Sequence, residues 1–106
     1  MDVKEYSLNF TSKAEADLDE IYAYIANDLL APDAAERLMN EIESRIMRLK
    51  TFPYSCGFVL DEPLKMRGYR KLVVNNYMIF YLVHEQGHQV VITRILYGAS
   101  DYQTIL

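Results

Sequence analysis

The fold is decided by residues 12–53, which read SKAEADLDEIYAYIANDLLAPDAAERLMNEIESRIMRLKTFP. Apolar residues recur in this stretch every three or four positions, which places them on one face of each of two successive helices. Pro32 suits the first position of the second helix. Phe52-Pro53 ends that helix, because a residue before proline avoids helical angles. Two long helices joined by a few residues lie antiparallel, as a hairpin. The predicted apolar stripes are Ala14, Leu18, Ile21, Ile25 and Leu29, and then Ala35, Leu38, Ile42, Ile46 and Leu49.

One strand is predicted before the hairpin. Residues 6–10 alternate apolar and polar side chains, as a strand with one buried face does. Ser12 and Glu15 have the spacing of a capping box, in which the Ser12 hydroxyl accepts a hydrogen bond from the Glu15 amide. We therefore expect Ser12 to cap the first helix.

Three further strands are predicted after the hairpin. Residues 53–64 contain two prolines and a glycine and are expected to form a loop. Strand patterns follow at 69–74, 77–84 and 89–97, separated by Asn75-Asn76 and by a turn at 85–88. The stretch 77–84 is almost wholly apolar, which is typical of a central strand covered on both faces. A second capping box that starts at Ser100 is expected to open one last helical turn up to Leu106.

The element order is therefore β-α-α-β-β-β. This order predicts an α+β domain in which the helical hairpin packs on a small, mostly antiparallel sheet. With 106 residues, of which 51% are hydrophobic and 25% charged, the composition is that of one globular domain over residues 1–106.

Composition also excludes several classes of protein. No apolar stretch is long enough to span a bilayer, and the first ten residues lack the pattern of a secretory signal peptide. A single cysteine, Cys56, fits a reducing cytoplasm. The two histidines and this cysteine are far apart in the sequence, and the common nucleotide-binding motifs are absent. We therefore expect no metal, no cofactor and no membrane partner.

The net charge of −4 is unevenly distributed along the chain. Residues 1–62 contain 6 basic and 13 acidic residues, whereas residues 63–106 contain 5 basic and 2 acidic ones. This asymmetry hints at two faces with different partners. A sequence pI near 5.1 disfavours an unaided nucleic-acid binder, because such domains are usually strongly basic. Four of the five late basic residues lie close together and either contact a target or form a solvated surface: Lys65, Arg67, Arg70 and Lys71.

Arg94 lies within an otherwise apolar strand, so its charge must point outward or be paired. Either it faces a target as a cation on the sheet, or it pairs with a carboxylate of a helix or near Asp101. His84 flanks a predicted turn, where a histidine can act as a general base but is usually only exposed. Tyr97 and Tyr102, near the chain end, are the tyrosines best placed to contact a partner.

Three segments together resemble the RelE/ParE superfamily of toxins from bacterial type II toxin–antitoxin modules. They are residues 16–53 of the hairpin, residues 64–83 (LKMRGYRKLVVNNYMIFYLV) and residues 90–106 (VVITRILYGASDYQTIL). The resemblance implies a helical hairpin on a small antiparallel sheet and a cognate antitoxin that wraps and silences the toxin. One branch, similar to RelE, cleaves messenger RNA in the ribosome, and the other, similar to ParE, poisons DNA gyrase.

The residues associated with RelE-type cleavage are mostly missing. Such cleavage needs a base, an acid and cations for the charged phosphate. Lys71 matches one lysine of the RelE pattern, but Tyr69 stands at the other lysine position. The remaining differences are Met78 and Ser100 in place of two arginines, and Leu106 about where a tyrosine is expected unless Tyr102 substitutes for it. The ending RILYGASDYQTIL looks more like ParE, although Met78 also replaces an arginine common in that branch.

The sequence therefore predicts a ParE-like toxin that inhibits gyrase by binding and is neutralised by an antitoxin. The residues expected to contact the target are Arg67, Arg70, Lys71, Arg94 and Tyr97. One alternative is a ribosome-dependent RNase with a rearranged site built from Lys71, Arg94, His84 and Tyr102. Another is a non-toxic homologue that acts only as a partner of the antitoxin.

Overall fold

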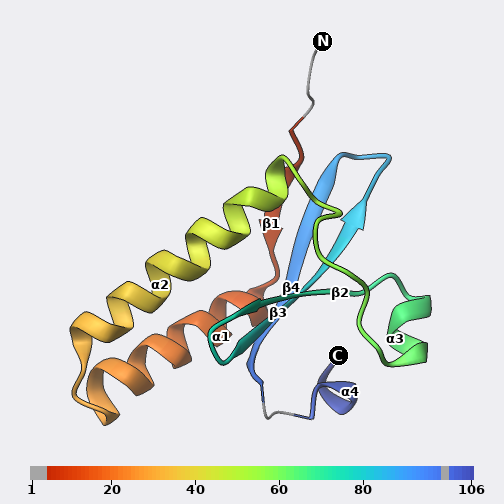
Figure 1. Ribbon diagram of the computed structural model, residues 1–106. Coiled ribbons are helices and arrows are strands. Elements are labelled where there is room, and N and C mark those ends of the chain that lie inside the picture. Colours follow the sequence, from red (N-terminus) through yellow and green to blue (C-terminus); the bar gives the residue numbers. More distant parts are fainter. Residues whose placement is uncertain (1–4, 99–100) are drawn as a thin grey trace.

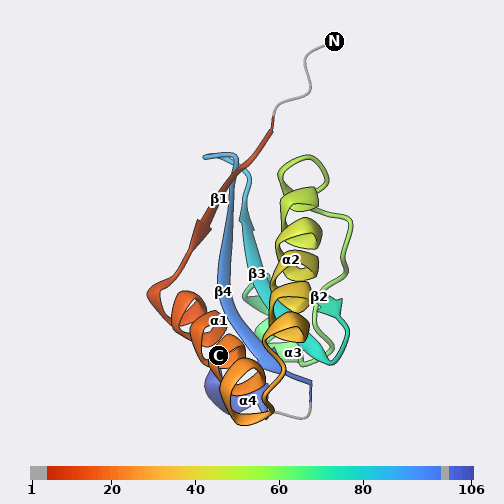
Figure 2. The same ribbon diagram turned by 90° about the vertical axis from the view of Figure 1, so that its left-hand side faces the viewer.

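A computed structural model describes residues 5–98 and 101–106 of the chain (Figure 1). It consists of a helical hairpin on one face of a four-stranded sheet, with a short helix and the chain end on the other side (Figures 1 and 2). This arrangement confirms the predicted α+β fold. The elements are β1 (Ser7–Phe10), α1 (Ser12–Ala23), the π-helix η1 (Tyr24–Asp28), α2 (Pro32–Met47), the 3₁₀ helix η2 (Arg48–Lys50), α3 (Glu62–Met66), β2 (Arg70–Val74), β3 (Tyr77–His84), β4 (Gln89–Tyr97) and α4 (Tyr102–Ile105).

The strands lie in the order β1-β4-β3-β2. β2–β3 and β3–β4 pair antiparallel, whereas β1 pairs parallel with β4, Ser7 opposite Gln89. The predicted bounds of the last two strands are confirmed residue for residue. β4 also contains a bulge: Phe80 of β3 pairs with Arg94 and Tyr81 with Ile92, which leaves Thr93 as an extra residue.

The main core lies between the hairpin and the sheet. Ile42 and Ile46 of α2 pack there with Ile79 and Tyr81 of β3, all four almost completely buried. Burial raises the pKa of the Tyr81 phenol, whose hydroxyl donates a hydrogen bond to the Pro53 carbonyl at 3.0 Å. The whole predicted α2 stripe is buried: Ala35, Leu38, Ile42, Ile46 and Leu49.

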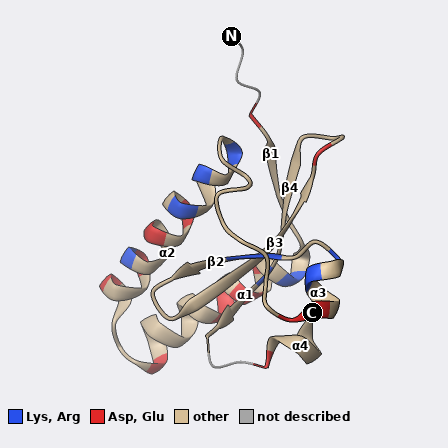
Figure 3. Cartoon of the chain, turned by 45° about the vertical axis from the view of Figure 1, so that its right-hand side comes forward, with Lys and Arg blue, Asp and Glu red and all other residues tan. Residues whose placement is uncertain are grey.

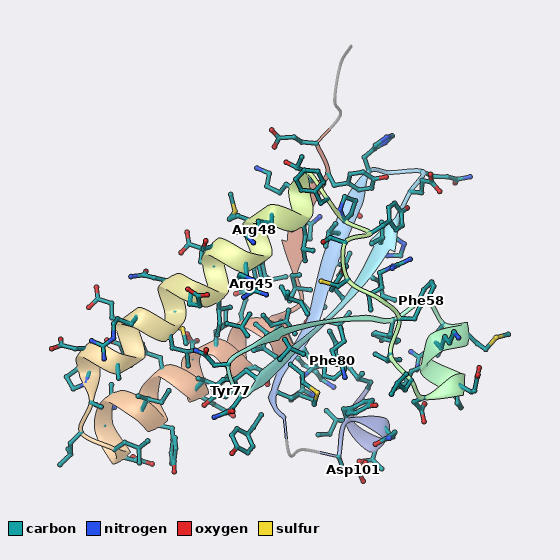
Figure 4. All side chains as sticks on the ribbon, in the orientation of Figure 1. Arg45, Arg48, Phe58, Tyr77, Phe80 and Asp101 are labelled. Carbon is teal, nitrogen blue, oxygen red and sulfur yellow. The ribbon has the colours of Figure 1, made fainter. Side chains whose placement is uncertain are left out.

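A second, smaller cluster covers the opposite face of the sheet. Phe80 of β3 is fully buried there among residues from β3, β4, α3, the segments that flank α3, and the chain end (Figure 4). The central strand is thus covered on both faces, as predicted. The expectation of an uninterrupted loop over 53–64 is wrong, because Asp61 accepts a hydrogen bond from Leu64 N at 3.3 Å and caps α3. The buried members of this second cluster are Val59, Leu64, Tyr69, Met78, Phe80 and Leu96.

The start of α1 differs from the sequence prediction. Thr11, not Ser12, is the N-cap, and its Oγ1 accepts a hydrogen bond from Ala14 N at 3.1 Å. The same hydroxyl donates to the Thr93 carbonyl at 2.8 Å, inside the β4 bulge. Thr11 makes one bond to the helix and one to the sheet. The bond to the sheet explains why Thr11, rather than the adjacent Ser12, is the N-cap.

The end of the first helix also differs. The last turn is the π-helix η1, in which the Leu29 amide donates to the Tyr24 carbonyl at 3.0 Å. This wider turn rotates Leu29 off the buried stripe, so the prediction that it joins the core is wrong. Leu30 follows with a positive φ of 53°. At the other end of the chain the predicted helical turn is present as α4, and the proposed cap Ser100 lies outside the described residues.

Replacing Thr11 by alanine tests the assignment of the α1 cap. We expect Thr11→Ala to lower the free energy of unfolding by about 1–2 kcal/mol, because the cap and the bond to Thr93 are both lost. Ser12→Ala is the matched control and should leave stability almost unchanged. The midpoints of urea denaturation report both values. Equal losses in the two variants would contradict the assignment.

Candidate functional site

A groove of about 900 Å³ lies between the hairpin tip and one end of the sheet. Its walls come from α1, η1 and α2 on one side, and from the β2–β3 turn and the end of β4 on the other. Leu29 and Tyr97 are half exposed at its rim. The lining side chains used below are Asp17, Glu20, Tyr24, Leu29, Tyr77, Arg94 and Tyr97.

An aromatic pair forms one wall of this groove. The rings of Tyr77 and Tyr97 meet edge to face, with centroids 5.8 Å apart. Tyr77 lies on β3 on the side of the hairpin (Figure 4). Burial raises the pKa of the Tyr77 phenol. A neutral phenol can donate a hydrogen bond as well as accept one. The wall suits an apolar ligand surface that carries a few hydrogen-bonding groups.

An ion pair forms the floor. Arg94 Nε and Nη2 donate to the two carboxylate oxygens of Asp17, each at 2.8 Å. The Ile95 amide also donates to Asp17 Oδ2, at 2.9 Å. The Asp17 side chain is 9% exposed and that of Arg94 21%. Hydrogen bonding to Asp17 raises the pKa of the Arg94 guanidinium. Of the two readings of Arg94, the structure therefore supports the one in which it pairs with a helix carboxylate.

Arg70 is also engaged within the molecule. Its Nη1 donates to the Cys56 carbonyl at 2.6 Å, and its guanidinium stacks on the ring of Phe58 at 4.1 Å and on that of Tyr54 at 5.0 Å. These contacts fasten the loop before α3 to the start of β2. Arg70 is thus held in place as a structural cation rather than presented freely to a target.

The four residues of the alternative nuclease site do not all converge. Lys71 pairs with Phe80 across β2–β3, and the Tyr102 ring lies 5.0 Å from the Phe80 ring, so these two share one neighbourhood. Arg94 pairs with Phe80 across β3–β4, but its guanidinium is hydrogen-bonded to Asp17. His84 is exposed four residues farther along β3, about 13 Å from Phe80 at the usual rise of a strand.

The positions that depart from the RelE pattern are apolar in the structure as well. Met78 is buried in the second cluster, and Leu106 packs against the same cluster. Neither side chain contributes a charge or a titratable group at that face. Ser100, the third departure, lies outside the described residues.

Several features of this surface escaped the sequence analysis. Tyr24 and Leu29 enter the groove because η1 changes the helical register, and the asparagines of the β2–β3 turn enter it because the sheet ends beside the hairpin tip. A π-helix has no strong local signal, so only the tertiary structure identifies these residues.

Over residues 5–98 and 101–106 there is no cluster of three or more potential metal ligands. Within the same ranges no helix is long and apolar enough to cross a membrane.

Comparison with known proteins agrees with this architecture. The family model described as the ParE toxin of the type II toxin–antitoxin system parDE matches residues 8–102. The chain is similar to a protein in the structure of a chromosomal ParDE toxin–antitoxin system from P. aeruginosa, with 27% identity, a TM-score of 0.71 and coverage of 89% of this chain and 97% of that one. A chain of the RelBE2 toxin–antitoxin complex from Mycobacterium tuberculosis shares the fold, with 21% identity, a TM-score of 0.63 and coverage of 93% and 98%. Among curated proteins, none matches the sequence closely.

A double-mutant cycle tests the Asp17–Arg94 pair. We expect a coupling free energy of about 2 kcal/mol between Asp17→Ala and Arg94→Ala, because the pair is bidentate and mostly shielded from water. The matched control is the exposed pair Glu41–Arg45, separated by 3.8 Å, whose coupling should be about 0.5 kcal/mol or less. Urea denaturation of the single and double variants supplies both values. A coupling at Asp17–Arg94 as small as in the control would contradict the structural role.

Proposed function

The chain belongs to the ParE toxin family of type II toxin–antitoxin systems, and from this membership we propose that it acts in the cytoplasm as a toxin that binds and inhibits DNA gyrase. In this proposal a cognate antitoxin neutralises the chain by binding it, and release of the toxin arrests growth. The mode of action is binding to a protein rather than cleavage of RNA.

The observation that carries this proposal is the apolar filling of the sheet face that the RelE pattern would use for cleavage. Met78 and Phe80 are buried there, and Tyr102 packs on Phe80 instead of standing free beside a cation. General acid–base cleavage of RNA needs titratable groups near the phosphate, with cations to stabilise its charge. Among the described positions compared with the RelE pattern, Lys71 supplies the only cation, whereas Arg67 lies outside that pattern on the same side of the sheet.

The groove at the hairpin tip is the proposed antitoxin site. Its wall is aromatic and aliphatic, and Glu20 adds one acidic group at the side of α1. An amphipathic helix can lay its apolar face in such a groove, and a basic residue on that helix would pair with Glu20. The two similar structures come from toxin–antitoxin systems, which agrees with a partner of this kind.

The proposed target contacts remain Arg67, Arg70, Lys71, Arg94 and Tyr97, but they differ in availability. Arg70 and Arg94 are tied to Cys56 and Asp17, so they support the surface more than they extend from it. Tyr97 lies at the rim of the groove. Arg67 is exposed on the far side of the sheet from the hairpin, with its guanidinium 5.1 Å from the Tyr69 ring.

A supercoiling assay with purified gyrase tests the proposed target. We expect the purified chain to inhibit the supercoiling of relaxed plasmid, and a stoichiometric amount of the cognate antitoxin to restore it. The parallel measurement is primer extension on messages after induction in cells. Ribosome-positioned cuts that disappear in Lys71→Ala, without inhibition of gyrase, would establish the nuclease alternative instead. Unaffected growth after induction would point to the non-toxic homologue.

A substitution at the groove rim tests the proposed antitoxin site. Leu29→Asp places a charge on an apolar wall, and we expect it to weaken antitoxin binding at least about tenfold. Phe52→Asp is the matched control, because Phe52 is similarly exposed but does not line the groove. Isothermal titration with the purified antitoxin measures both affinities. Equal affinities of the antitoxin for the two variants would show that it binds another surface.

A further inference from the structure

Two apolar side chains extend into solvent around α3. Leu60 is 88% exposed and Met66 is 83% exposed, which makes them more exposed than Phe58 or Tyr54 of the same loop. Lys65 and Arg67, both exposed, flank Met66 in the sequence. We call Leu60, Lys65, Met66 and Arg67 the α3 surface. A contiguous exposed apolar patch rimmed by charged residues is characteristic of an interaction site.

This surface rests on a rigid base. Val59, Leu64 and Tyr69 are all buried in the second cluster and hold both ends of the segment against the sheet. The Tyr69 amide donates to the Leu64 carbonyl at 3.1 Å, and Gly68 turns the chain back with a φ of 88°. A side chain other than glycine would be strained at that angle. The four exposed side chains are therefore presented with little conformational freedom of the backbone to lose on binding.

Within the described residues, the cations of the α3 surface form no ion pair. In the part of the chain that the structure describes, the ion pairs join Arg45 to Glu41, Lys50 to Glu5 and Arg94 to Asp17, and none involves Lys65 or Arg67. Figure 3 shows basic residues on α3 and on neighbouring β2, and acidic ones at the start of α3 and on α1. Residues 60–71 contain four basic residues and two acidic ones, Asp61 and Glu62, so the basic charge is in excess there. A locally basic surface on a chain of net charge −4 is complementary to an acidic partner.

From this combination we infer that the α3 surface is the contact through which the toxin grips an acidic segment of its protein target, with Leu60 and Met66 as apolar anchors. The inference rests on the proposed function and deepens it. A protein segment fits better than a nucleic acid, because a phosphate backbone pairs with Lys65 and Arg67 but leaves the two apolar anchors in water.

The α3 surface is separate from the groove at the hairpin tip. α3 precedes the Arg70 end of β2, whereas the groove begins at the β2–β3 turn beyond Val74. None of the four residues of the α3 surface lines that groove. An antitoxin bound only in the groove therefore does not contact the α3 surface.

Inhibition of gyrase supercoiling by purified toxin variants tests the inference. Lys65→Glu/Arg67→Glu reverses the charges, and Leu60→Ser/Met66→Ser removes the anchors while keeping the charges. The charge-matched control is Arg37→Glu/Arg48→Glu, with Arg37 on α2 and Arg48 at the start of η2, in the opposite layer of the fold; Arg48 is labelled in Figure 4. Met47→Ser/Phe52→Ser is the control for lost apolar side chains. All four pairs are exposed, so urea midpoints should confirm that every variant is folded.

We expect each α3 variant to need at least about tenfold more protein for half-inhibition, with both controls close to the unmodified chain. Inhibition by the α3 variants at the unmodified concentration would overturn the inference and leave gyrase as the target. Equal losses in α3 and control variants would also overturn it. No inhibition by the unmodified chain would remove the proposed function and this inference with it. Tight binding of a labelled DNA duplex without gyrase, lost in Lys65→Glu/Arg67→Glu, would assign the surface to phosphates instead.

Discussion

The constraint on which the fold depends is the attachment of α1 to the bulge in β4. Thr11 bonds the Thr93 carbonyl, and six residues later the Asp17 carboxylate accepts from the Arg94 side chain and the Ile95 amide. The bulge breaks strict alternation, so that Ile92 and Ile95 both face the hairpin core. The groups that make this attachment are mostly buried, and their hydrogen bonds are directional. They therefore fix the position of the hairpin on the sheet, and the Asp17–Arg94 pair forms the floor of the groove.

In this architecture β3 is covered on both sides. One face of the strand packs under the hairpin and the other under α3 and the chain end, so every position along its middle must be apolar. A methionine at position 78 is favourable in that environment, whereas an arginine there would need a partner or a path to water. The same burial that stabilises the domain therefore removes a cation from the face that the RelE pattern uses for cleavage.

Four of the five basic residues after position 62 divide into two groups that their sequence spacing does not reveal. Arg70 and Arg94 are held by a carbonyl with two aromatic rings and by a carboxylate, so their charges serve the fold. Lys65 and Arg67 extend from a rigid turn without an ion pair in the described ranges. Availability to a partner thus depends on what each guanidinium or ammonium contacts, which is a property of the packed chain.

The sequence by itself determined the hairpin, the last two strands and the fold class, because 3.6-residue and two-residue apolar periodicities are local signals. It also determined the family resemblance that the family match confirms. Only the tertiary structure decided between Thr11 and Ser12 as the cap, turned Leu29 out of the core and paired Arg94 with Asp17. Each of these depends on a hydrogen bond or a change of register between segments far apart in the chain. No periodic pattern in the sequence indicates such contacts, because they form only after the hairpin and the sheet have packed together.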